Sequence, residues 1–218
     1  IEAKHNGSYG VLSEGGKINI QGNGGHTLDV EGNGRYGLLA KDGGNIAISG
    51  MNVSGNSQAQ SMAGIERDGL IHLANSTITT DNDALFYTWS DSDTQKAQFV
   101  LDGSVAEGHG KALAQFYAHH STLSATDSSL TNAMLTDHAS GASSTVTLNR
   151  STWAIKANSD ITHLTSNHSL VDLRGSGQFN TLTVAGNYAG NNSTLVMNTA
   201  LGDDDSQTDK LVVSGDTS

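Results

Sequence analysis

The chain has 218 residues and a formal net charge of -11 at neutral pH, because 22 acidic residues face 11 basic ones. This charge repels phosphate backbones, so nucleic acid is excluded as an expected partner. Glycine, serine, threonine and asparagine supply 91 residues and aromatic residues only 5%, which disfavours helices and indicates an all-β chain. Cysteine is absent, which excludes disulfides, thiolate metal sites and cysteine nucleophiles.

A repeat begins near the N-terminus. Residues 9–12 (YGVL), 36–39 (YGLL) and 63–66 (AGIE) resemble one another in steps of 27 residues. A Gly-Gly or Asp-Gly turn follows each of them, and then two apolar residues in alternation, which predicts short strands with a period of two. These apolar pairs are Ile18 and Ile20, Ile46 and Ile48, and Ile71 and Leu73.

The pattern continues more loosely over the rest of residues 1–178, with corner motifs such as Asn75-Ser76 and Asp102-Gly103-Ser104. Units this small cannot bury their apolar residues alone and must stack on one another. We therefore predict a right-handed parallel β-helix of about eight coils with three short strands per coil. Ile18, Ile46 and Ile71 should form one interior column. A leucine-rich repeat is disfavoured because its leucine spacing and helical return segments are missing.

The sequence changes character in residues 179–218. Alternating segments at 179–190, 193–199 and 210–213 are separated by a polar turn that contains three consecutive aspartates. This pattern predicts a separate hairpin-like module that caps the open end of the β-helix, because an uncovered end exposes unpaired backbone groups. Its buried face should consist of Leu182, Val184, Leu195, Leu211 and Val213.

Within this tail, LTVAGNYAG at 182–190 and TDKLVVSG at 208–215 resemble the C-terminal end of autotransporter passenger domains of the pertactin and AIDA type. The resemblance implies a bacterial outer-membrane system in which the passenger is exported through its own C-terminal β-barrel. It also implies that residues 179–218 begin an autochaperone region, which caps the β-helix and seeds its folding. The passenger would then stand at the cell surface or be secreted after cleavage.

A β-helical polysaccharide-active enzyme is the alternative. The Gly-His-Gly at 108–110 resembles that of polygalacturonases, and Asp81 and Asp83 lie about one coil before His109. Inverting glycosidases need two carboxyl groups, one as acid and one as base. The Arg-x-Lys of polygalacturonases is missing, however, so we expect no enzymatic activity from this segment. A protease or toxin head N-terminal to it stays possible.

No cofactor or metal is expected. Asp203, Asp204, Asp205 and Asp209 could supply oxygen ligands for Ca²⁺, but no calcium-binding repeat accompanies them, and the histidines lack a zinc-site spacing. Ser90 and Ser92 lack a nucleophile-elbow motif. A solvated acidic turn and surface histidines are therefore favoured.

The main aromatic cluster consists of Tyr87, Trp89, Phe116 and Tyr117. If exposed, these rings could stack on sugars or on a protein. The polar segment 90–97 should form a loop beside them. The sequence thus predicts an adhesin stalk whose partners are a host or bacterial surface protein or glycan, or a second copy of itself.

Overall fold

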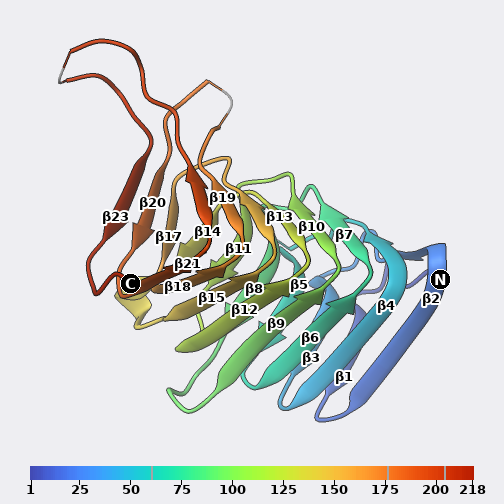
Figure 1. Cartoon of the computed structure of the whole chain (residues 1–218). Coiled ribbons are helices and arrows are strands. Elements are labelled where there is room, and N and C mark those ends of the chain that lie inside the picture. The colour runs from blue at the N-terminus through green and yellow to red at the C-terminus, as the bar shows by residue number, and fades with distance from the viewer. Residues whose placement is uncertain (60, 176, 204) are drawn as a thin grey trace.

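The computed structural model describes residues 1–59, 61–175, 177–203 and 205–218. The chain winds into a rod of parallel β-coils, and in Figure 1 the colours from blue to red follow one another along the rod. This arrangement confirms the predicted all-β parallel β-helix. One short 3₁₀ turn, η1 (His138–Ser140), interrupts the strands.

One side of the rod is a nine-stranded sheet, with one strand from each successive coil. Every pairing in this sheet is parallel. Its strands in spatial order are β1 (Tyr9–Glu14), β3 (Tyr36–Lys41), β5 (Ser61–Glu66), β8 (Ala84–Trp89), β11 (Ala112–Phe116), β14 (Met134–Thr136), β17 (Ser159–Ile161), β20 (Thr181–Val184) and β23 (Lys210–Val213).

A fourteen-stranded sheet forms the other two sides, because the long strand β4 (Gly44–Ser54) pairs with β6 (Gly69–Ala74) along its first half and with β7 (Thr77–Thr80) along its second. Strand β2 (Lys17–Asp29) extends over both of these sides, as β4 does. The other strands of the second side are β6 (Gly69–Ala74), β9 (Lys96–Asp102), β12 (His120–Thr126), β15 (Ser144–Asn149), β18 (His163–Asn167) and β21 (Tyr188–Asn191). The third side holds β7 (Thr77–Thr80), β10 (Val105–Gly108), β13 (Ser129–Thr131), β16 (Thr152–Ala154), β19 (Leu170–Asp172) and β22 (Thr194–Val196). Each coil therefore has three strand positions, as predicted.

The core consists of apolar columns that run along the rod. Ile18, Ile46 and Ile71 are register partners as predicted, with Ile46 and Ile71 fully buried and Ile18 half-buried at the first coil. Leu28 pairs with Val53 at another position. Because each coil contributes one residue to each column, a coil buries its apolar side chains only against the coils next to it.

The corner between the second and third sides carries a ladder of buried serines. From one coil to the next, the backbone N–H of a corner serine donates to the hydroxyl of the following corner serine over 3.0–3.1 Å, in five successive bonds that end at Ser193. The residue before each serine has a left-handed φ of 46–57°, which turns the chain sharply. The corner serines are Ser76, Ser104, Ser128, Ser151, Ser169 and Ser193. The predicted corner motifs are therefore the units of one continuous hydrogen-bonded ladder.

The third repeat is shifted from its predicted register. Tyr9 pairs with Tyr36 as expected, but Gly64 pairs with Leu39 rather than with Gly37. The second coil is therefore two residues shorter on this side than the 27-residue step predicts.

The strands of residues 179–218 continue the three parallel ladders of the rod. β20 pairs with β23, β21 with β18 and β22 with β19, all in parallel. The hairpin character that was expected of this segment is found at one antiparallel bridge, between Thr199 and Thr208. That bridge closes the loop that projects from the rod between β22 and β23 in Figure 1. Another predicted loop, at 90–97, is shorter than expected, since β9 begins at Lys96.

Candidate functional site

Asp209 joins three segments of the last two coils, and we call this contact the Asp209 junction. The side chain is fully buried. Its two carboxylate oxygens accept hydrogen bonds from the backbone N–H groups of Asn180, at 2.7 Å, and Asn198, at 2.6 Å. Asn180 in turn donates from Nδ2 to the carbonyl of Leu173 at 2.8 Å. A buried carboxylate is tolerated only when such donors replace water, so the three segments must assemble together.

The predicted capping residues lie in the same two coils. Leu182 and Val184 are fully buried, while Leu195, Leu211 and Val213 are half-buried and pack against the core. Leu182 pairs with Leu211. These residues thus extend the interior columns to the C-terminal end of the rod.

The acidic turn differs from Asp209 in burial. Asp203 and Asp205 are exposed, and Asp204 lies outside the described residues. Within the described part of the chain, no group of three potential metal ligands is found.

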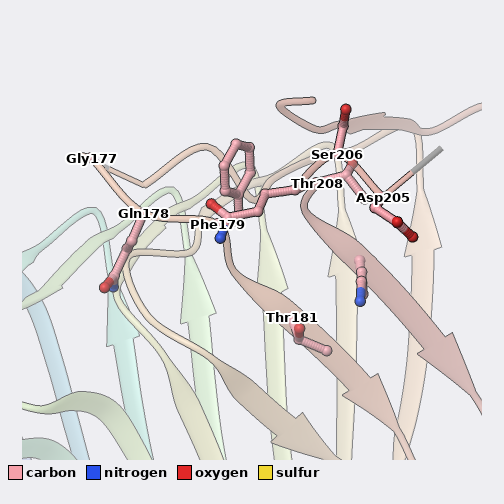
Figure 2. A pocket seen from close by; sticks show the side chains of 9 residues that line it. Gly177, Gln178, Phe179, Thr181, Asp205, Ser206 and Thr208 are labelled. Carbon is pink, nitrogen blue, oxygen red and sulfur yellow. The ribbon is translucent and has the colours of Figure 1, made fainter. Parts of the chain in front are cut away.

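A polar groove lies beside the junction. Figure 2 shows Gly177, Gln178 and Phe179 on one loop facing Asp205, Ser206 and Thr208 on the other. Thr181 and Lys210 line the groove on the strand side. The groove is open to solvent and polar, apart from the half-buried Phe179 ring.

A second candidate site lies on the outer face of the nine-stranded sheet. Four tyrosines follow one another along the rod, with ring centroids 6.5 Å apart for Tyr9 and Tyr36, 6.2 Å for Tyr36 and Tyr87, and 5.3 Å for Tyr87 and Tyr117. The ring of Tyr36 reaches Tyr87 by crossing Gly64, where a Cβ atom would come within 2.8 Å of that ring.

Charged and aromatic side chains complete this site, which we call the aromatic groove. It is lined by Arg35, Tyr36, Glu66, Tyr87 and Trp89. Arg35 donates to Glu66 Oε1 at 3.1 Å and to the hydroxyl of Tyr9 at 3.0 Å. Its guanidinium carbon lies 5.8 Å from the ring centroids of both Tyr9 and Tyr36, so cation–π contacts also hold it in place.

The phenol groups of this groove are neutral at physiological pH. Burial, reinforced by the Glu66 carboxylate, raises the pKa of Tyr36 far above its ordinary value. Burial also raises the pKa of Tyr87, with Tyr117 as a smaller contributor. Both hydroxyls therefore remain available as hydrogen-bond donors.

The four aromatic residues of the predicted cluster differ in their exposure. Trp89 is 38% exposed, Tyr117 is 36% exposed and Tyr87 is half-buried. Phe116 is wrong as a surface residue, because its side chain is fully buried in the core. Alternation along the strand explains this difference, since neighbouring residues point to opposite faces. Arg35, Tyr36 and Glu66 were not predicted as part of this site, because they belong to earlier coils.

Asp81 and His109 come together on the surface. Nδ1 of His109 lies 3.1 Å from Asp81 Oδ1, and Nε2 lies 3.6 Å from Glu107 Oε2. Asp83 instead accepts from Lys111 Nζ at 2.6 Å. The imidazole therefore faces two carboxylates in an open position, where solvent reaches all three groups.

Ser90 is buried and forms a pair with a histidine. Its hydroxyl lies 3.0 Å from His119 Nδ1 and accepts the backbone N–H of the same residue. Within the described residues, no carboxylate contacts the His119 ring. Ser92 bonds within its own loop, to Thr94.

Comparison with known proteins identifies the C-terminal coils. Residues 159–218 match the family model described as Autochaperone Domain Type 1. This match begins at β17 and includes the Asp209 junction and all five predicted capping residues.

Two curated relatives match shorter stretches. The chain is 53% identical over 53 residues to the uncharacterized protein YuaQ of Escherichia coli strain K12, which is 24% of this chain and 4% of that protein. It is 58% identical over 38 residues to the uncharacterized protein YdeU of the same organism, which is 17% of this chain and 8% of that protein. The chain thus spans a small part of these relatives. No solved structure matches it.

The autochaperone match at residues 159–218 and the parallel β-helix together support an autotransporter passenger stalk as the class of protein. Residues 159–218 are similar to an autochaperone domain of type 1, and they form the C-terminal coils of the β-helix. An autochaperone domain of this kind implies a passenger that is surface-exposed or secreted. In the described residues, no helix combines the length and apolar character that a membrane span requires.

Proposed function

We propose that the chain is the non-enzymatic stalk of an autotransporter adhesin at the bacterial cell surface, and that its C-terminal coils cap the rod and seed its folding. The observation that carries the proposal is the autochaperone match at the end of a continuous parallel β-helix. The Asp209 junction supports the folding role, because it brings together segments that close two successive coils. Exposed Trp89 and Tyr117 support the adhesive role.

Competition tests adhesion by this segment. The purified chain, whose folded state is verified by circular dichroism, is added in excess to bacteria that display the full-length protein. If this segment binds the target, attachment of the bacteria to host cells should fall, and the heat-unfolded chain should have no effect. Unchanged attachment in the presence of folded chain would contradict an adhesive role for this segment.

Self-association is the second adhesive mode that we propose, and it should depend on salt. Two copies that each carry a charge of -11 repel one another at low ionic strength, while salt screens this repulsion. Sedimentation velocity should therefore show more dimer at about 500 mM than at about 20 mM NaCl. A monomer under both conditions would exclude this mode.

A polysaccharide-active enzyme is the alternative that one observation favours, namely the contact of His109 with Asp81 and Glu107. A carboxylate pair around an imidazole could transfer protons during glycan cleavage. Incubation of the chain with polygalacturonate tests this alternative. Release of reducing ends by the wild type and its loss in His109→Ala would support the enzyme; no release by the wild type would remove it.

A further inference from the structure

We propose that the aromatic groove, together with the adjoining Tyr117 ring, binds a neutral oligosaccharide, with Trp89 and Tyr117 as the stacking platform and Arg35 and Glu66 as the hydrogen-bonding edge. This inference rests on the adhesive part of the proposed function, and it specifies the ligand class and the residues. It concerns a face of the rod that lies outside the autochaperone segment.

The rings lie in two neighbouring columns on the outer face of one sheet. Trp89 is the register partner of Glu66, and Tyr87 is the register partner of Gly64. Tyr117 lies in the next coil, where its backbone N–H donates to the carbonyl of Thr88. Successive strands of a sheet are about 4.8 Å apart, so the platform extends along the rod and can contact more than one sugar ring.

The rings are held rigidly before any ligand binds. Tyr36 is almost fully buried and stacks on Tyr9, while the half-buried Tyr87 contacts Tyr36 and Tyr117 with tilted rings. Their fixed position lowers the conformational entropy that is lost on binding. A sugar presents an apolar C–H face that stacks on aromatic rings and a rim of hydroxyls that form hydrogen bonds.

Charge favours an uncharged sugar over an acidic one. The guanidinium of Arg35 is neutralised locally by Glu66 at 3.1 Å, and the phenols of Tyr36 and Tyr87 are neutral. The chain as a whole carries -11 charges, which repel uronic and sialic acids. The groove still offers donors and acceptors, because Arg35 has five N–H groups and the carboxylate accepts several hydrogen bonds.

Binding to defined sugars tests the proposal. The purified chain is titrated by calorimetry with cellotetraose, maltotetraose and the tetramer of N-acetylglucosamine, and with tetragalacturonate as the acidic probe. We expect at least one neutral probe to bind with a Kd below about 10 mM, and tetragalacturonate to bind more weakly. Trp89→Ala and Tyr117→Ala should weaken binding at least about tenfold.

Two variants serve as controls. Leu12→Ala removes a side chain of nearly equal exposure, 37% against 38% for Trp89, from the same sheet, and should bind the sugar as the wild type does. Tyr117→Phe keeps the ring and should also retain binding. Circular dichroism of every variant separates a lost contact from a lost fold.

Several results would overturn the proposal. These are the absence of binding by all three neutral probes, a preference for tetragalacturonate, and neutral binding that persists in Trp89→Ala. Dimer formation that depends on Trp89, without sugar binding, would assign the groove to a second protein copy instead. The titrations use only purified chain and free sugars. A failure of sugar binding is therefore distinguishable from a failure of the adhesion proposal, which is tested with bacteria and host cells.

Discussion

Asp209 shows how one side chain determines the end of the rod. Asp209→Asn preserves the shape but replaces one acceptor oxygen with an N–H₂ group, which meets a backbone donor at Asn180 or Asn198. Losing a charge-assisted bond and leaving a buried donor unsatisfied should cost about 1.5–3 kcal/mol of unfolding free energy. Urea denaturation measures this change. Asp203→Asn, in the exposed part of the same loop, is the control and should leave stability unchanged.

Asp127 and Arg150 make stability depend on pH. Arg150 donates twice to the Asp127 carboxylate, at 2.7 Å each, and these hydrogen bonds lower the pKa of Asp127. The pKa of Asp127 is thus lower in the folded than in the unfolded state. The pair therefore stabilises the fold at pH values above the ordinary aspartate pKa of about 4, and this stabilisation is lost as the pH falls through the pKa of Asp127 in the folded state.

Arg150→Gln should therefore lose stability at neutral pH and approach the wild type in acid. Urea denaturation of the wild type and of Arg150→Gln at about pH 7 and about pH 3 measures the free energy of unfolding with Asp127 charged and as it becomes protonated. The Asp42–Arg67 and Asp172–Arg174 pairs remain in both proteins, so the difference in unfolding free energy between wild type and variant reports on the Asp127–Arg150 pair. An equal difference at both pH values would exclude the ion pair as the cause.

The corner is the element that the serine ladder stabilises. Ser128 accepts the backbone N–H of Ser104 at 3.0 Å and donates to the carbonyl of Thr126 at 2.8 Å. Ser128→Ala leaves the buried N–H of Ser104 without its acceptor, so we expect a loss of about 1–3 kcal/mol. Ser129→Ala, at the neighbouring half-buried position, should change stability much less. Thermal or urea unfolding that is equal for the two variants would contradict the ladder.

Local pattern predicts the individual elements well but not their partners. Alternation identifies the strands that contain Ile46 and Ile71, and the corner motifs coincide with left-handed residues such as Asn75. Pairing in a β-helix joins residues of adjacent coils, however, and a short alternating segment is equally compatible with a hairpin. β20 and β23 therefore show the same alternation as a hairpin, although they pair in parallel.

The aromatic groove could be predicted only in part for the same reason. Trp89 and Tyr117 belong to a cluster that is visible along the sequence, and alternation could have placed Phe116 inside. Tyr36 reaches the groove because Gly64 has no side chain to block its ring. The shift of register that places Gly64 there depends on the length of the preceding coil, which no local motif specifies.

At the scale of the whole molecule, stability accumulates coil by coil. Each strand pairs with equivalent strands of the adjacent coils, so the first closed coil is the costly step and later coils add to an existing template. The sequence alone indicates this behaviour, since the repeat is visible over most of the chain. Which end provides the first coil is a kinetic question, and the autochaperone match points to the C-terminal end.

Two deletions of similar length distinguish the ends. A chain without residues 179–218 loses the Asp209 junction and β20–β23, while a chain without residues 1–35 loses β1 and β2. If the C-terminal coils form the nucleus, the first deletion should slow refolding at least about tenfold, whereas the second should mainly speed unfolding. Stopped-flow refolding and unfolding from urea measure both rates. Equal slowing of refolding by the two deletions would mean that folding can start anywhere along the rod, and the C-terminal coils would then act as a cap alone.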